Sequence, residues 1–289
     1  MNTKLNFPLL INTEWNTRVC SNFNNIRAKS LFIPIFLLLL IVLFLIEKKA
    51  LSVNSYIHIQ KDAFYFINYN LGLFPNTIHN ITQLGDASII LSFFCIFILY
   101  APKILESLVS SSLVSLIFSS VLKNIFLVPR PAMVFDNNSF IIVGKTAVGY
   151  ASLPSGHAIT VFATLTILML ALMPVKLHCK ISWVLFIMSI GLCIVFTRVG
   201  VGAHYPLDVI VGSILGYIAA LTGIIITKKW NPWTWITNKK YYHIVIVLLT
   251  ILASTLLYKI LTINLIIFYF SLVSLITILI IIIKIYVKK

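Results

Sequence analysis

Three short clusters of polar residues stand at the ends of long apolar stretches in this sequence. The first contains Lys123 and Arg130, the second is Pro-Ser-Gly-His at residues 154–157, and the third runs from Arg198 to Asp208. Together they supply permanent cations, two imidazoles and a carboxylate. Cations stabilise phosphoryl oxygens, and an imidazole can attack phosphorus or transfer a proton. These residue types suggest phosphoryl chemistry, provided that the fold brings the clusters together.

Arg130 has an unusual setting within the first cluster. Pro129 and Pro131 flank it, so the backbone on both sides is held out of a helix. A guanidinium on such a stiff turn can offer its fork of donors to an oxyanion. Taken alone, Lys123 is more simply a lysine whose head group reaches water at the end of a membrane span, and Arg130 a charge that sets topology.

The second cluster opens an apolar run that begins at residue 158. Ser155 is a good helix cap, and the first amides of that helix would face any anion placed there. Gly156 allows close approach because it has no side chain, and His157 adds a proton donor. The simpler alternative is that Ser155 only caps the helix and His157 lies at the water interface.

The third cluster contains an imidazole and a carboxylate four residues apart. If a helix begins near His204, then His204 and Asp208 lie on one side of it, within hydrogen-bond reach. A carboxylate behind an imidazole fixes its tautomer and leaves the other nitrogen free to react. The pair is a weak signal in isolation, as is Arg198 at the end of an apolar stretch.

The composition decides what kind of protein holds these clusters. Hydrophobic residues make up 60% of the 289-residue chain, charged residues make up 10%, and the mean hydropathy is +1.03. These values exclude an ordinary soluble domain and predict an all-α, polytopic membrane bundle, because lipid leaves no water for unpaired backbone groups.

We expect eight membrane spans, each approaching the length of about 20 residues that a bilayer requires. They lie near residues 31–46, 86–101, 106–122, 158–175, 181–197, 206–227, 243–261 and 263–283. The chain then divides into a loosely ordered cytoplasmic tail (1–30), a six-span core (31–227), and an inner aromatic and basic loop with a C-terminal hairpin (228–289). Between the first two spans, we expect an amphipathic helix or a lid.

The net charge of +15 is spread over short loops, which argues against nucleic-acid binding and suggests contact with anionic membrane lipids. With the N-terminus inside, 14 of the 22 Lys and Arg residues fall on the inner side. This bias predicts that both termini are cytoplasmic and that all three clusters lie at the outer face. The three cations there would repel one another unless an anion sat between them, and a phosphate suits that position.

With these three clusters, the sequence resembles the type 2 phosphatidic acid phosphatase (PAP2) family. Its signature has three parts: Lys, six residues and Arg-Pro; then Pro-Ser-Gly-His; then Ser-Arg, five residues, His, three residues and Asp. Lys123 to Pro131, residues 154–157, and Arg198 with His204 and Asp208 match these parts. One position departs, because Thr197 replaces the usual serine, although it keeps the hydroxyl. The resemblance covers residues 31–227 and leaves the tail and the hairpin to be interpreted separately.

The chemistry and the resemblance together imply a mechanism. His204 is the expected nucleophile, which forms a phosphohistidine, and Asp208 orients it. His157 would protonate the leaving oxygen and then help to activate water. Phosphate binding is assigned to Lys123, Arg130, Arg198 and the amides near Ser155 and Gly156. We expect no metal and no other cofactor. The remaining histidines (His58, His79, His178 and His243) are interpreted as interfacial or loop residues.

The expected substrate is a lipid phosphate or diphosphate: undecaprenyl diphosphate, phosphatidylglycerophosphate, phosphatidic acid or lipid A. The motifs recognise only the phosphoryl group, so they leave this choice and the oligomeric state open. We expect an integral protein of the bacterial inner membrane with a periplasmic active site. A lipid phosphotransferase, a vanadate-holding haloperoxidase and an anion transporter are the alternatives, and the membrane-embedded chain argues against the haloperoxidase.

Overall fold

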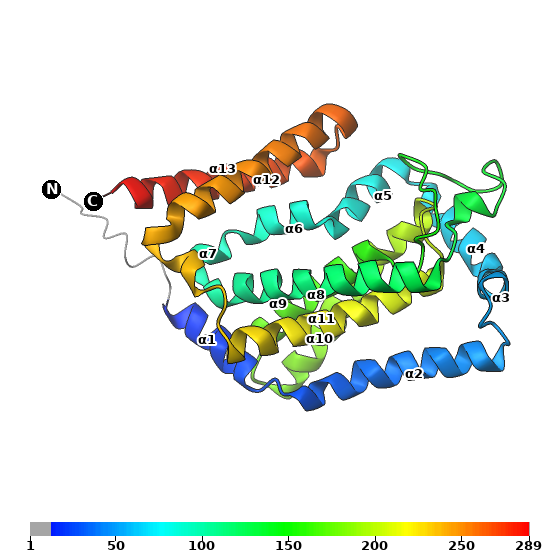
Figure 1. Ribbon diagram of the computed structural model, residues 1–289, viewed down its shortest axis with the longest axis horizontal. Coiled ribbons are helices and arrows are strands. Elements are labelled where there is room, and N and C mark those ends of the chain that lie inside the picture. Colours follow the sequence, from blue (N-terminus) through cyan, green and yellow to red (C-terminus); the bar gives the residue numbers. More distant parts are fainter. Residues whose placement is uncertain (1–12, 289) are drawn as a thin grey trace.

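The computed structural model describes residues 13–288, in which every regular element is a helix (Figure 1). Six helices in this part of the chain are long and apolar enough to cross a membrane. The first of them is Ala28–Glu47, in which the short turn η2 (Ala28–Leu31) continues into α2 (Phe32–Glu47). The other five contain α8 (Pro102–Phe126), α10 (Leu177–Gly200), α11 (Pro206–Lys229), α12 (Tyr242–Ile263) and α13 (Ile266–Val287). The predicted all-α membrane bundle is therefore confirmed.

Two of the predicted spans have a different form. The stretch 86–101 is divided into α6 (Ala87–Phe94) and α7 (Phe97–Tyr100), with the break at Cys95 and Ile96. The stretch 158–175 is α9 (Gly156–Ala171), whose 16 residues make it shorter than a usual span. Because α9 packs against α8, α10 and α11, it is largely buried in protein, and its hydrophobicity reflects that core position as well as the membrane.

The N-terminal segment is more ordered than the sequence analysis predicted. Residues 13–24 form α1 (Thr13–Asn24), and Val19, Phe23 and Ile26 are buried in a cluster with residues of α8, α9 and α11. The side chain of Asn22 also donates to the carbonyl of Ala171, 2.8 Å away at the end of α9. This apolar face makes α1 part of the bundle. Residues 1–12 of the predicted tail lie outside the described residues.

The segment between the first two spans folds into several short helices, where we expected one amphipathic helix or a lid. They are α3 (Val53–His58), α4 (Lys61–Gly72), α5 (Pro75–Thr82) and the turn η3 (Gln83–Gly85), and α4 and α5 pack against α10. Asn68 joins this layer to the segment 127–155, because its amide nitrogen donates to Ile141 O (2.8 Å) and its oxygen accepts from Ile141 N (2.8 Å).

The C-terminal hairpin consists of α12 and α13, which pack against α6 on the side of the bundle opposite α2 (Figure 1). A hydrophobic cluster fills this interface, with Ile89 and Leu105 from the core and Leu256, Phe268 and Leu275 from the hairpin. The expected inner aromatic belt is partly buried, because Trp233 donates to Ser110 Oγ (2.7 Å) while Trp230 is exposed.

The arrangement of the helices separates the two ends of the bundle. Helix α1 and the end of α13 lie at one end, and α3, α4 and α5 lie at the other (Figure 1). The loop segment 127–155 lies beside α4 at that second end.

Candidate active site

The three sequence clusters meet where four core helices begin or end. Lys123 is in the last turn of α8 and Arg198 in the last turn of α10, whereas Ser155 caps α9 and Asp208 is in the first turn of α11. Arg130 follows α8, His204 precedes α11, and Gly156 and His157 are the first two residues of α9. Chain direction brings these residues to one end, because consecutive antiparallel helices alternate their starts and ends there. The packing of α9 against α8, α10 and α11 then brings the helix ends together.

Arg130 contacts His204 directly. Its Nη1 lies 3.5 Å from Nε2 of His204 and also donates to the carbonyl of Ala203 at 3.1 Å. The backbone amide of Arg130 donates to Gly149 O at 3.0 Å, which fixes the turn between the two prolines. The guanidinium is thus held beside Nε2 of the imidazole, where its donors could bind an oxyanion.

His204 is almost completely buried, with 2% of its surface exposed, in the loop between α10 and α11. Burial lowers the pKa of His204 well below its usual value, and the charges of Arg130, Arg198 and Lys123 lower it further. The imidazole is therefore held neutral, which is the form that can act as a nucleophile.

The predicted pairing of His204 with Asp208 needs one correction. Helix α11 begins at Pro206, so the two residues do not share a helix face. His204 Nδ1 lies 3.6 Å from Asp208 Oδ2 and makes no hydrogen bond of normal geometry among the described residues, although the backbone of Ser152 is close enough to act on the ring. The carboxylate is placed behind the imidazole, but at slightly more than hydrogen-bond distance.

Asp208 is held by three donors that the sequence analysis did not identify. Its Oδ1 accepts from Tyr56 OH (2.7 Å), and its Oδ2 accepts from Ser152 Oγ (2.6 Å) and from the amide of Tyr205 (2.9 Å). Gln60 supports the same corner, since its side chain accepts from Leu207 N and donates to Tyr56 O. Ser152 could have been suspected from its place just before Pro-Ser-Gly-His, but no sequence signal marked Tyr56.

Ser155 caps α9, as predicted, but its backbone amide does not take the predicted role in phosphate binding. Its hydroxyl accepts from Ala158 N (3.5 Å), which confirms the helix cap. Its backbone amide donates to Asp208 O (3.0 Å), so that amide is already used and does not face a phosphate. The first amides of a helix have no partner within it, which leaves those of Gly156 and His157 for an anion.

Gly156 lies close to the first cluster. A Cβ atom at this position would lie 3.6 Å from Lys123 Nζ and 3.3 Å from Ser119 Oγ. The start of α9, the lysine ammonium and the serine hydroxyl therefore border one small space. Ser119, one turn before Lys123 on α8, is a further polar residue that the sequence analysis missed.

Arg198 completes the set of cations. Its Nη1 donates to Thr82 Oγ1 (3.0 Å), and its buried Nε has no hydrogen-bond partner among the described residues. An unpaired buried donor is costly, so an acceptor from a bound anion would stabilise it. Burial lowers the pKa of His79, and the charge of Arg198 lowers it further. The sequence had suggested only an interfacial or loop position for His79. Thr197 donates to Ile194 O (2.5 Å), within its own helix.

His157 is partly exposed at the start of α9 and lies among charges from several elements. The charges that act on its ring include those of Arg198, Asp86 and Lys123, and the ring of His204 is also close enough to act on it. In residues 13–288, no group of three or more His, Cys, Asp or Glu side chains could hold a metal ion.

Comparison with known proteins places this geometry in a family. A sequence profile described as the PAP2 superfamily matches residues 104–233. An undecaprenyl-diphosphatase of Sulfolobus acidocaldarius is 30% identical over 183 residues, which is 62% of this chain and 84% of that protein. The chain belongs to the PAP2 superfamily. Family membership and this relative make the protein a membrane phosphatase, as the resemblance implied. The eight predicted site residues all fall within residues 104–233.

A solved structure is also similar. The crystal structure of Aquifex aeolicus LpxE matches with a TM-score of 0.48 and 22% identity, over 58% of this PAP2 chain and 95% of that chain. The C-terminal hairpin lies outside residues 104–233, the part that the PAP2 profile matches.

Proposed function

We propose that this PAP2 phosphatase removes a phosphoryl group from a lipid phosphate or diphosphate through a phosphohistidine at His204. One observation carries the proposal: the buried imidazole of His204 stands between a carboxylate and a guanidinium. His204 has Asp208 Oδ2 3.6 Å from Nδ1 and Arg130 Nη1 3.5 Å from Nε2. The nitrogen beside the cation is the one that can attack a bound phosphoryl group.

The proposed reaction has two steps. In the first, His204 Nε2 attacks phosphorus, the bond from phosphorus to the leaving oxygen breaks, and His157 gives that oxygen a proton. In the second, His157 takes a proton from water, the resulting hydroxide attacks phosphorus, and the phosphorus–nitrogen bond breaks to release inorganic phosphate. Lys123, Arg130 and Arg198 neutralise the phosphoryl oxygens in both steps.

An apolar groove next to the site supports a lipid substrate. It has a volume of about 560 Å³ and lies between α2, α3, α8 and α11. Val128, Leu153 and Tyr56 line it, and Tyr56 also bonds to Asp208. A hydrocarbon chain in this groove would keep its phosphate head within reach of the polar end of the bundle.

The similarity to an undecaprenyl-diphosphatase makes a polyprenyl diphosphate the first substrate to test. Phosphatidylglycerophosphate, phosphatidic acid and lipid A phosphates present the same group to the site. The distribution of basic residues supports a cytoplasmic location for both termini and a site on the outer, periplasmic face of a bacterial inner membrane. We also propose the division into an N-terminal segment (1–30), a catalytic core (31–227) and a C-terminal loop and hairpin (228–289).

The test is phosphate release from a panel of these lipids by the purified protein in detergent. The wild type should release phosphate from at least one of them, and His204→Ala should release none while remaining inserted and folded. His178→Ala, a change outside the site, is the matched control and should keep wild-type activity. Near-normal turnover by His204→Ala would overturn the nucleophile assignment, and a wild type inactive on every lipid would overturn the proposed function. A parallel reaction with an added lipid or sugar acceptor separates hydrolysis from phosphoryl transfer.

A further inference from the structure

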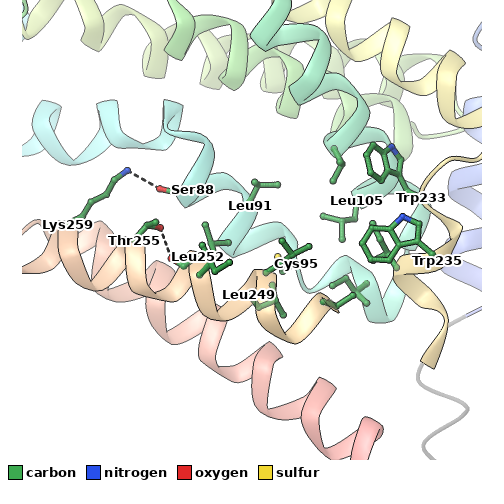
Figure 2. A pocket seen from close by; sticks show the side chains of 16 residues that line it. Ser88, Leu91, Cys95, Leu105, Trp233, Trp235, Leu249, Leu252, Thr255 and Lys259 are labelled. Carbon is green, nitrogen blue, oxygen red and sulfur yellow. Dashed lines mark hydrogen bonds between the residues drawn. The ribbon is translucent and has the colours of Figure 1, made fainter. Parts of the chain in front are cut away.

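The C-terminal hairpin makes a charged contact with the core near the outer end of the bundle. Nζ of Lys259, on α12, lies 2.6 Å from Asp86 Oδ2 and 2.9 Å from Ser88 Oγ. Figure 2 shows Lys259 and Ser88 at one end of a pocket between α6 and α12, with Trp233 and Trp235 at the other. The pocket has a volume of about 580 Å³ and its lining between these ends is mainly apolar. Lys259 is therefore a polar connection in a largely apolar interface.

Asp86 connects this contact to the active site. It caps α6, since its Oδ1 accepts from the amide of Ser88 (2.9 Å) and from Ser88 Oγ (2.5 Å). The preceding residue, Gly85, packs against His157 so closely that a Cβ on it would lie 2.7 Å from His157 Cβ and 2.9 Å from Cδ2. Lys259 thus binds the Gly85–Asp86 segment, which packs against the side chain of His157.

The charges around His157 make this contact chemically important. Burial disfavours the protonated form of the ring most, and Arg198 from α10, His204 and Lys123 from α8 disfavour it further. Asp86 is the carboxylate that opposes them and favours the protonated form. Lys259 and the groups of Ser88 are the partners of Asp86. The negative charge that His157 experiences therefore depends on how fully Lys259 compensates Asp86.

We propose that Lys259 is a positioning residue for the proton-transferring His157: it fixes the Gly85–Asp86 segment under the imidazole and balances the Asp86 carboxylate. The hairpin then contributes to catalysis by positioning His157. Both Asp86 and Lys259 lie outside residues 104–233, so the PAP2 match does not include them. The inference rests on the proposed function, because it assumes that His157 protonates the leaving group.

The competing explanation is that Lys259 only anchors the hairpin to the core. The two explanations differ in how kcat responds to pH. A general acid must be protonated to act, so the alkaline limb of kcat reports the loss of its proton. An anchoring contact would change folding or stability and would leave the position of that limb unchanged.

The experiment measures kcat and KM against pH for the full chain in detergent, with the best lipid phosphate found in the panel. The variants are Lys259→Met, Asp86→Asn, the double variant and Lys259→Arg. Lys284→Met is the matched control, because Lys284 is an exposed lysine on α13 of the same hairpin. Thermal unfolding of every variant accompanies the kinetics.

Lys259→Met leaves Asp86 uncompensated, so the protonated imidazole is favoured and the alkaline limb should move up by roughly half to one pH unit. Asp86→Asn leaves Lys259 uncompensated, so the limb should move down by a similar amount. In the double variant the alkaline limb should return towards its wild-type position. Lys259→Arg and Lys284→Met should leave the limb at the wild-type position. At neutral pH, Lys259→Met should lower kcat about tenfold through displacement of His157, with KM little changed.

Equal profiles for Lys259→Met and Lys284→Met, on an active wild type, would overturn the inference while the proposed function stands. Shifts of the same sign in both single variants would also overturn it, because a common structural defect would then explain them. If Lys259→Met cannot be purified in folded form, Asp86→Asn decides the question, since an unshifted limb there excludes the electrostatic link. An inactive wild type would instead overturn the proposed function on which the inference depends.

Discussion

Nδ1 of His204 lies 3.6 Å from Oδ2 of Asp208, although both side chains are almost completely buried. Asp208 uses its oxygens to accept from Tyr56, Ser152 and the amide of Tyr205. A small movement of the imidazole towards the carboxylate would form a hydrogen bond, and catalytic hydrogen bonds often shorten when substrate binds. The carboxylate is thus already fixed by three donors, independently of the imidazole.

Asp208→Asn should lower kcat by roughly 10²- to 10⁴-fold, because an amide cannot stabilise the charge that develops on His204 or hold its tautomer. Phosphate release under saturating substrate checks this, together with thermal unfolding to confirm a folded protein. Activity within about threefold of the wild type, in a folded variant, would mean that Asp208 is not the orienting group.

Tyr56→Phe should lower kcat about tenfold, since it removes one of three donors to a buried carboxylate and keeps the packed ring. Tyr65→Phe is the matched control, because its hydroxyl pairs with the exposed Ser139 Oγ (2.9 Å) and not with Asp208, so the change should be neutral. The two variants are compared in the same phosphate-release assay. Equal activity of both would show that the Tyr56 bond is not needed for turnover.

Gly156→Ala should lower kcat/KM by about 10- to 100-fold, because the added Cβ would occupy space beside Lys123 Nζ that a phosphate needs. The change should alter stability little, because the nearest atom to the added Cβ is the hydroxyl oxygen of Ser119 at 3.3 Å, which needs to shift by only a few tenths of an ångström. Steady-state kinetics and thermal unfolding measure the two effects. A loss of stability without a loss of kcat/KM would contradict the predicted role in phosphate binding.

The pH dependence of kcat/KM should show an acid limb below about pH 6.5, the ordinary imidazole pKa. Burial and the neighbouring cations lower the pKa of His204, so its neutral, nucleophilic form persists as the pH falls and is lost only at the lowered value. A pH titration of kcat/KM on the wild type measures this limb. An acid limb above about pH 6.5 would show that His204 is not held neutral in the free protein.

Activity should survive treatment with EDTA, because Lys123, Arg130 and Arg198 already supply the positive charge that a metal ion supplies in other phosphoryl-transfer enzymes. The wild type is assayed before and after chelation and again after addition of Mg²⁺. Complete loss with EDTA and recovery with Mg²⁺ would contradict the proposed mechanism.

Much of this protein follows from the sequence because the relevant signals are local. Hydropathy over windows of about 20 residues marks the long spans, and the spacing within each motif places its side chains at a helix end. Ser155 as a cap and Pro206 in the first turn of α11 follow in the same way. The alternation of antiparallel helices then brings Lys123, His157, Arg198 and His204 to one end of the bundle.

Tertiary contacts decided what those local signals could not. Tyr56 reaches Asp208 across 152 positions, and Lys259 reaches Asp86 across 173. Such pairings depend on how whole helices pack, and neither tyrosine nor lysine at a helix end carries a signal of its partner. The sequence by itself therefore determined the membrane bundle and the residues that are proposed to react. The tertiary structure decided which buried donors hold Asp208 and which charges surround His157, because those are set by packing between segments distant in the chain.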